Sequence, residues 1–258
     1  MNASVIIASY NYGAYLAEAI ESAAAQTVPP HEIIVVDDGS SDDSVSVARR
    51  YSVTVIERQH EGAQRAMEAG IQASSGECFM LLGADDRVAG NYLEKALPFL
   101  EHDSDVGLVY TSETLFGSVH DFIPARQFSH ARLLAANYVH GSAVIRRSAY
   151  DGTPGLATAP LAVYEDWYMV LDIVSNGWTA ARTNDTTLYY RQHGMSRNKT
   201  GGAEHEASIR AVITGHPQLY RPSAKMWYWL HRHLYRHQPQ AYTALALLAC
   251  KAQGRADC

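Results

Sequence analysis

The chain has 258 residues, of which 47% are hydrophobic and 19% charged, a composition typical of a globular protein rather than a disordered one. Its formal net charge of −6 argues against general nucleic-acid binding, because that function normally needs a basic surface. The sequence has neither the basic and apolar regions of a signal peptide nor an apolar run approaching the ~20 residues of a membrane-spanning helix. We therefore expect a cytoplasmic protein.

Segments with the periodicities of strands and helices alternate through the first half of the chain. Short apolar runs predict strands over residues 4–10, 32–38, 53–58, 78–82 and 106–112. Apolar residues at helical spacing predict helices over 15–26, 40–50, 63–74 and 92–100, the second opened by a capping box of Ser40 and Asp43. This alternation predicts a parallel, doubly wound sheet with helices on both faces.

The second half of the sequence is less regular. Residues 113–140 give weak signals and are expected to form a mobile loop region. The remaining predictions are a strand over 141–147, a helix over 163–177, two strands over 178–183 and 186–193, and helices after about residue 203 with a break at Pro239.

Four polar segments directly follow predicted strands. They read ASYN, DDGSSDD, RQHEG and GADD, the last of which contains Asp85 and Asp86. In doubly wound sheets, ligands bind outside the carboxyl ends of the strands, near the topological switch point. The four segments are therefore expected to converge on one edge of the sheet and to form the functional site there.

Asp85 and Asp86 place two like charges at the end of a buried strand, where neighbouring carboxylates repel each other. Either both are solvated, or a divalent cation such as Mg²⁺ or Mn²⁺ lies beside them and is also bound by substrate phosphates. Asp37 and Asp38 present a similar choice. They are either turn residues that cap the next helix, or one of them points into the ligand crevice.

Two later segments carry further candidates. Glu165 and Asp166 open a predicted helix, where they either offset the helix dipole or supply a general base for an attacking hydroxyl. Arg191 and His193 lie two residues apart at a strand end, so both face the same side of the sheet. Such a pair is a candidate phosphate or metal site.

The ordered set of these motifs, from SVIIASYNYG through EIIVVDDGSSDDS and LLGADD to the late ED and YRQHGMS, resembles glycosyltransferase family 2 over roughly residues 3–200. The resemblance implies a GT-A fold, with a Rossmann-like, mixed and mainly parallel sheet flanked by helices. It implies a glycosyltransferase domain over 1–202, with a nucleotide-binding half (1–110) and an acceptor-binding half (111–202). Residues 203–258 would form a C-terminal helical extension.

The resemblance also implies an inverting transfer of a sugar from a nucleotide-sugar donor, UDP- or dTDP-linked, with Mn²⁺ or Mg²⁺ as cofactor. The expected acceptor is a glycan or a lipid-linked saccharide in polysaccharide or cell-surface glycan biosynthesis. The matching donor-binding positions are Ala8, Tyr10, Asp37, Asp38, Asp85 and Arg191. The matching metal positions are Asp85, Asp86 and His193, and the catalytic base matches Asp166.

The sequence departs from the family pattern at two places. Gly83 stands where the first acid of the usual LDADD is expected, which leaves open whether Asp85 or Asp86 binds the metal directly. Met67 and Glu68 replace the usual Arg and Asn of the ARN-x-G motif, which bears on donor preference more than on activity.

The C-terminal segment 221–258 combines six Lys or Arg residues with one acid and several aromatic residues. We favour a helix that packs over the catalytic domain and exposes a basic face. The alternative is an interfacial helix at the inner face of the cell membrane, where Trp and Tyr lie at headgroup level and Arg meets anionic lipid.

Two other functions compete with glycosyl transfer. The first is a catalytically inactive nucleotide-sugar-binding module on the same fold, which the complete set of candidate catalytic residues disfavours. The second is phosphoryl or nucleotidyl transfer, which is disfavoured because the sequence has no P-loop and no DxDxT motif after the first strand.

Overall fold

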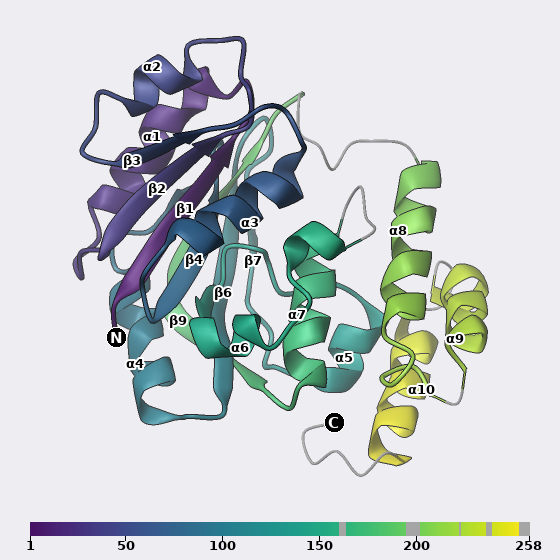
Figure 1. The fold of residues 1–258 in the computed structure, drawn as a ribbon. Coiled ribbons are helices and arrows are strands. Elements are labelled where there is room, and N and C mark those ends of the chain that lie inside the picture. The colour runs from purple at the N-terminus through teal and green to yellow at the C-terminus, as the bar shows by residue number, and fades with distance from the viewer. Residues whose placement is uncertain (160–163, 195–201, 222, 236–238, 253–258) are drawn as a thin grey trace.

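The computed structural model describes residues 1–159, 164–194, 202–221, 223–235 and 239–252 (Figure 1). Within them, one nine-stranded sheet runs in the order β3-β2-β1-β4-β8-β6-β9-β5, with β7 paired to β6. The strands are β1 (Ala3–Ser9), β2 (Glu32–Asp37), β3 (Thr54–Glu57), β4 (Cys78–Gly83), β5 (Arg87–Val88), β6 (Val106–Gly117), β7 (Asp121–Ile123), β8 (Val144–Arg146) and β9 (Thr179–Gln192).

Helices cover both faces of the sheet, and further helices extend beyond it. They are α1 (Gly13–Ala24), α2 (Ser44–Ala48), α3 (Ala63–Ala73), α4 (Tyr92–His102), α5 (His130–Ala135), α6 (Arg147–Asp151), α7 (Glu165–Ser175), α8 (Gly202–Gly215), α9 (Ala224–Leu230) and α10 (Pro239–Ala252). The 3₁₀ turn Leu156–Thr158 and the π-helical turn His231–Tyr235 complete the set. This confirms the predicted mixed, mainly parallel sheet flanked by helices.

The central strands are apolar along their whole length because helices bury them on both sides. In β1, Val5 and Ile7 pack into one hydrophobic cluster and Ile6 into the other, since successive strand side chains point to opposite faces. The first half of the sheet is therefore sandwiched between two cores, which gives its carboxyl edge a rigid base.

The topological switch lies between β1 and β4. From β1 the chain steps outward to β2 and β3, all parallel, and then returns to place β4 on the other side of β1. Ala8 of β1 pairs with Gly83 of β4, so the segments that follow these two strands begin side by side. A ligand crevice is expected at this point of a doubly wound sheet.

Three local predictions were wrong. Residues 113–140 include the end of β6, strand β7 and helix α5 rather than a mobile loop region. The two strands expected over 178–183 and 186–193 are one strand, β9, with an irregularity in its pairing to β6 where Asp185 has a positive φ of 59°. The Ser40–Asp43 capping box does not form. Instead Asp42 accepts hydrogen bonds from the Ser44 N–H and the Gly13 N–H, which ties α2 to α1.

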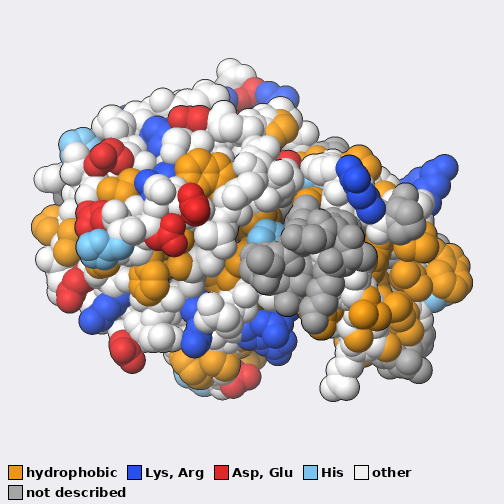
Figure 2. Space-filling view, turned by 90° about the horizontal axis from the view of Figure 1, so that it is seen from below, with side chains coloured by type: hydrophobic (Ala, Val, Ile, Leu, Met, Phe, Trp, Pro, Cys, Tyr) orange, Lys and Arg blue, Asp and Glu red, His pale blue; other side chains and the backbone are white. Residues whose placement is uncertain are grey.

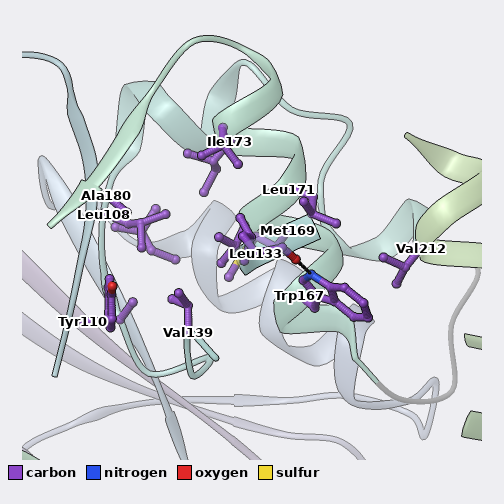
Figure 3. Close-up of a cluster of buried hydrophobic side chains, with 14 of the residues drawn as sticks. Leu108, Tyr110, Leu133, Val139, Trp167, Met169, Leu171, Ile173, Ala180 and Val212 are labelled. Carbon is purple, nitrogen blue, oxygen red and sulfur yellow. Dashed lines mark hydrogen bonds between the residues drawn. The ribbon is translucent and has the colours of Figure 1, made fainter. Parts of the chain in front are cut away.

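The hydrophobic cluster that contains Ile6 also fixes helix α7, whose first turn carries Asp166. Figure 3 shows Trp167, Met169, Leu171 and Ile173 of α7 among buried apolar side chains from the sheet and from α5. The Trp167 indole N–H donates to the Leu133 carbonyl at 2.8 Å. Because this large side chain is both buried and hydrogen-bonded, the start of α7 is held in a defined position.

The C-terminal helices lie to one side of the sheet, next to α5 and α7 (Figure 1). Helix α10 packs against α5, and the Tyr220 hydroxyl donates to the Leu134 carbonyl at 3.1 Å. The prediction that a helix of this segment packs over the preceding part of the chain is thus confirmed for its described residues. Among the helices of the described ranges, none has the length and apolar character needed to cross a membrane.

Candidate functional site

A cavity of about 920 Å³ opens at the carboxyl edge of the sheet, at the switch between β1 and β4. Of the candidate residues named from the sequence, those that line it are Ala8, Tyr10, Asp38, Asp85, Asp86, Glu165 and Asp166. They come from segments spread over more than half of the chain. The polar loops therefore do converge on one edge, and they surround a space of the size that small-molecule ligands occupy.

The acidic turn after β4 forms one wall of the cavity. Asp86 is 6% exposed, and its Oδ1 accepts a hydrogen bond from the Arg191 backbone N–H at 2.8 Å. Burial, together with the neighbouring charge of Asp85, raises the pKa of Asp86 well above its usual value. A Cβ on Gly83 would lie 2.6 Å from Asp86 Oδ2. The glycine that departs from the family pattern therefore leaves room for this carboxyl group.

The end of β9 meets the same turn. His193 Nε2 lies 2.8 Å from Asp85 Oδ2, although the two residues are 108 positions apart in the chain. The imidazole ring packs against both Tyr12 and Tyr15, with ring centroids 5.9 Å and 5.2 Å away. These contacts orient His193 toward Asp85.

Arg191 braces this arrangement from outside the cavity lining. Its Nε donates to the Asp85 carbonyl and its terminal nitrogen to Glu18, both at 2.8 Å, and its guanidinium lies 4.3 Å from the centroid of the Phe116 ring. These contacts point the Arg191 charge toward α1. Its predicted role in donor binding stays a prediction.

Asp38, which directly follows β2, forms a separate part of the cavity lining. Its two carboxylate oxygens accept hydrogen bonds from the backbone N–H groups of Glu61 and Gly62, both at 2.9 Å. The Tyr10 ring stacks on His60 with centroids 4.0 Å apart. Asp37, in contrast, lies outside the lining and accepts from the Ser40 N–H, so the structure separates the two neighbouring aspartates.

Asp166 lies at the start of α7 and lines the same cavity as the acidic turn. One carboxylate oxygen accepts from the Trp167 N–H at 2.7 Å and the other from the Asn137 side-chain amide at 3.0 Å. Burial raises the pKa of Asp166, and these two hydrogen bonds act in the opposite direction. Tyr164, which precedes the helix with a left-handed φ of 68°, also lines the cavity, and its hydroxyl lies 2.8 Å from His205 Nδ1 of α8.

Sequence reasoning missed Glu113 and Asn137. Glu113 lies on β6 and lines the cavity between the two acidic walls, where burial and the charge of Asp166 raise its pKa to about 7. The one available signal for Glu113 was an acid inside a long strand-forming run. Asn137 belongs to a segment without any recognisable motif, and only the fold brings it to Asp166.

The site has two side chains whose donor atoms suit a divalent cation. No group of three or more His, Cys, Asp or Glu residues positioned to hold a metal occurs within the described residues. Asp85, which lines the cavity, and His193, which lies outside its lining, present a carboxylate oxygen and an imidazole nitrogen to each other, however. Sites for Mg²⁺ and Mn²⁺ commonly use one or two protein ligands and take the others from substrate phosphates and water, so these two residues fit such an ion.

The two residues that replace the family's Arg and Asn have different surroundings. Met67 lines the cavity, whereas Glu68 accepts a hydrogen bond from the Tyr150 hydroxyl at 2.5 Å, away from the lining. The Tyr150 oxygen in turn accepts from the Leu156 N–H at 2.8 Å. Glu68 thus supports the 3₁₀ turn through Tyr150. Of these two residues, only Met67 lines the cavity, where it would contact a bound ligand.

The family model described as Glycosyl transferase family 2 matches residues 4–165, which is more than half of the chain and includes strand β4 and the acidic turn that follows it. The chain belongs to glycosyl transferase family 2. The family resemblance inferred from the motifs is thereby confirmed.

Two relatives extend the comparison. An uncharacterized glycosyltransferase of Haemophilus influenzae is 29% identical over 202 residues, which are 74% of this chain and 68% of the relative. WfaP of Escherichia coli, a UDP-Glc:alpha-D-GlcNAc-diphosphoundecaprenol beta-1,3-glucosyltransferase, is 26% identical over 209 residues, 76% of this chain and 80% of WfaP. This chain spans between 38% and 59% of the length of three other curated relatives that it matches.

Solved structures confirm the predicted GT-A fold. Staphylococcus aureus TarS in complex with UDP-GlcNAc superposes with a TM-score of 0.69 at 17% identity, over 83% of this chain and 66% of TarS. The mannosyltransferase PcManGT of Pyrobaculum calidifontis, in complex with GDP-Man and Mn²⁺, gives 0.68 at 19% identity, over 98% of this chain and 76% of that chain. At these identities the similarity is one of fold.

The raised pKa of Glu113 predicts a cost in stability that a neutral side chain would remove. Because the folded chain holds this proton up to a pH of about 7, the ionisation of Glu113 destabilises the fold as the pH rises from near 4.5 to 7. We expect Glu113→Gln to increase the free energy of unfolding above pH 7 by roughly 2–3 kcal/mol relative to the wild type, and to change it little below pH 4.5.

Urea unfolding of both proteins across this pH range measures the effect. The exposed Glu204→Gln on α8 is the matched control and is expected to follow the wild type at every pH. Parallel stability curves for Glu113→Gln and the wild type would contradict the prediction.

Proposed function

We propose that this chain is a metal-dependent, inverting glycosyltransferase that transfers a sugar from a nucleoside-diphosphate sugar to an acceptor hydroxyl. The observation that carries the proposal is the contact of His193 with Asp85, which lines a cavity whose lining also includes Asp166. A cation-binding pair and a carboxylate base at one cavity are the groups that this reaction needs. Membership of glycosyl transferase family 2 supports the same chemistry.

The donor nucleotide is proposed to lie between the β1 end and Asp38. Asp38 Oδ1 retains a lone pair beyond the one that accepts from the Glu61 N–H, so it can still accept from a base N–H, whereas Oδ2 also contacts His60 Nδ1 at 2.9 Å. Ala8 and Tyr10 line the same part of the cavity. UDP or dTDP is the proposed nucleotide, and the TarS complex with UDP-GlcNAc supports a uracil nucleotide on this fold.

Asp85 and His193 are the proposed ligands of Mn²⁺ or Mg²⁺. Asp86 already uses Oδ1 to accept the Arg191 N–H, and its Oδ2 lies against Gly83, which favours Asp85 as the direct ligand. A bound divalent cation would act as a Lewis acid and stabilise the nucleoside-diphosphate leaving group. The Mn²⁺ in the PcManGT complex supports a metal on this fold.

Asp166 is the proposed general base. Its carboxylate takes the proton of the acceptor hydroxyl as the acceptor oxygen bonds to the anomeric carbon and the bond from that carbon to the diphosphate breaks. Attack from the face opposite the leaving group inverts the anomeric configuration. Burial raises the pKa of Asp166 toward neutrality, where a base is more effective at removing the proton of a hydroxyl.

The acceptor is proposed to be a hydroxyl of a glycan or a lipid-linked saccharide. The WfaP relative supports a lipid-linked acceptor, since its name specifies a diphosphoundecaprenol-linked GlcNAc. The side of the cavity formed by Asn137, Tyr138 and Tyr164 adjoins Asp166 and is the proposed place of the acceptor.

Metal-dependent nucleotide binding tests the first part of this proposal. We expect Mn²⁺ to strengthen UDP binding to the wild type in isothermal titration calorimetry, and His193→Ala to weaken the Mn²⁺-dependent component by at least about tenfold because one protein ligand is lost. His102→Ala, which alters an exposed histidine at the end of α4, is the control and should bind as the wild type does. UDP affinity that is independent of both Mn²⁺ and His193 would contradict the metal assignment.

Substitution of the base tests the second part. We expect Asp166→Asn to reduce sugar transfer by ~10²–10⁴-fold and to leave UDP–Mn²⁺ affinity nearly unchanged, because the carboxylate acts on the acceptor and not on the nucleotide. Transfer is measured over a panel of nucleotide sugars, with the exposed Asp151→Asn as control. Full turnover by Asp166→Asn would contradict the base assignment, and donor binding by the wild type without transfer or hydrolysis would favour the inactive module.

The pH dependence of transfer tests the surroundings of Asp166. Asn137→Ala removes a hydrogen bond that lowers the pKa of Asp166, so the acid limb of kcat/KM should move to higher pH. Because Glu113 holds its proton up to a pH of about 7, Glu113→Gln removes little negative charge over the acid limb, which should stay close to that of the wild type. The Asn137→Ala shift is expected to be on the order of 0.5–1 pH unit. Acid limbs that coincide for Asn137→Ala and the wild type would show that Asn137 does not act on the base.

A further inference from the structure

Helix α10 is apolar on two opposite sides. The sequence from Pro239 to Cys250 contains no Asp, Glu, Lys or Arg. Tyr242, Ala246 and Cys250, four residues apart, are fully buried against the rest of the protein. Leu245 and Leu248 lie on the other side and are 39% and 64% exposed. A surface helix usually turns charged or polar residues toward solvent, and α10 does not.

Helix α9 shows the same division. The Trp227 indole is buried, donates to the Arg221 carbonyl at 2.8 Å and packs on Tyr242 of α10 with ring centroids 5.6 Å apart. Met226 and Trp229, on the other side of α9, are 39% and 58% exposed. We call Met226, Trp229, Leu245 and Leu248 the C-terminal apolar face.

Figure 2 shows hydrophobic side chains gathered over the C-terminal helices, with Lys and Arg side chains near them. Lys225 and Arg221 are exposed next to the C-terminal apolar face. From Arg221 to the last residue the sequence has six Lys or Arg and one acid, Asp257, whereas the whole chain carries a net charge of −6. The apolar face and an excess of basic residues therefore occur in the same C-terminal segment, whereas the rest of the chain is acidic.

We infer that the C-terminal apolar face docks on the surface of an anionic lipid bilayer. Exposed Leu and Met side chains would enter the boundary between headgroups and acyl chains, and Trp229 would lie at headgroup level, where its ring is favoured. The basic residues of the segment would face the anionic headgroups. A second copy of this chain fits less well, because a symmetric interface would bring two basic surfaces together.

The docking surface is connected to the cavity by the fold. Helix α8, which precedes α9, contacts the cavity through His205 and Tyr164. Docking by α9 and α10 would therefore hold the cavity at a bilayer, where a lipid-linked acceptor resides. The inference goes beyond the proposed function and does not depend on its donor or metal chemistry, since it rests on the surface of α9 and α10.

Vesicle sedimentation with the full chain tests the inference. We expect the wild type to sediment with phosphatidylglycerol vesicles, to do so much less with phosphatidylcholine vesicles, and to be released as the salt concentration rises. Leu245→Ser combined with Leu248→Ser should weaken binding to phosphatidylglycerol by about tenfold or more, because two apolar side chains no longer enter the interface.

Phe99→Ser on α4 is the matched control, because Phe99 is 40% exposed, as Leu245 is, but lies outside the C-terminal helices. It should bind vesicles as the wild type does. UDP calorimetry and circular dichroism establish that each variant is folded, and they report on the donor site independently of lipid binding. Lys225→Glu should weaken vesicle binding without altering the apolar residues.

The absence of wild-type binding to phosphatidylglycerol, or equal binding by the double leucine variant and by Phe99→Ser, would overturn the inference. A wild-type dimer in sedimentation equilibrium that the double leucine variant converts to a monomer, together with the absence of vesicle binding, would assign this face to self-association instead. The absence of UDP binding by the wild type would count against the proposed function and would not affect the conclusion on lipid binding.

Discussion

The contact between the end of β9 and the acidic turn after β4 is the constraint on which the site depends. Three interactions join them: the Asp85 carboxylate with the His193 ring, the Asp85 carbonyl with the Arg191 guanidinium, and the Asp86 carboxylate with the Arg191 N–H. They join the ends of β4 and β9, which are separated by β8 and β6 in the sheet. Without them the two adjacent aspartates would face each other with no compensating group, and the cavity would lose the wall that is proposed to hold the diphosphate.

The carboxyl groups of this cavity are tuned in different ways by the same low-polarity surroundings. Asp38 is surrounded by hydrogen-bond donors, whereas burial raises the pKa of Asp86, Glu113 and Asp166, with a further contribution from neighbouring carboxylates at Asp86 and Glu113. A concentration of buried acids with so little compensation is unfavourable for the isolated protein. The proposed cation would offset part of this cost, so on the proposed function the site gives up stability for activity.

Much of this arrangement could be predicted from the sequence, and the limits have physical reasons. Strand alternation and the polar segments after each strand placed Asp38, Asp85 and Asp86 at one edge, because parallel strands end together. The sequence could not separate Asp37 from Asp38, since opposite directions of adjacent strand side chains decide which one reaches the cavity. It also could not reveal Asn137 or Glu113, whose importance arises only from tertiary proximity to Asp166.

The way Asp38 is held has a consequence for how this pocket drifts in evolution. Two of its partners are the main-chain N–H groups of positions 61 and 62, which every residue except proline supplies, and the third is the His60 ring. Glu61 is therefore replaceable without loosening the aspartate, whereas position 62, with a φ of 98°, strongly favours glycine. Covariation between side chains of homologous sequences would miss these main-chain hydrogen bonds. Asp38 would still be held firmly even where such comparisons find no covarying partner for it.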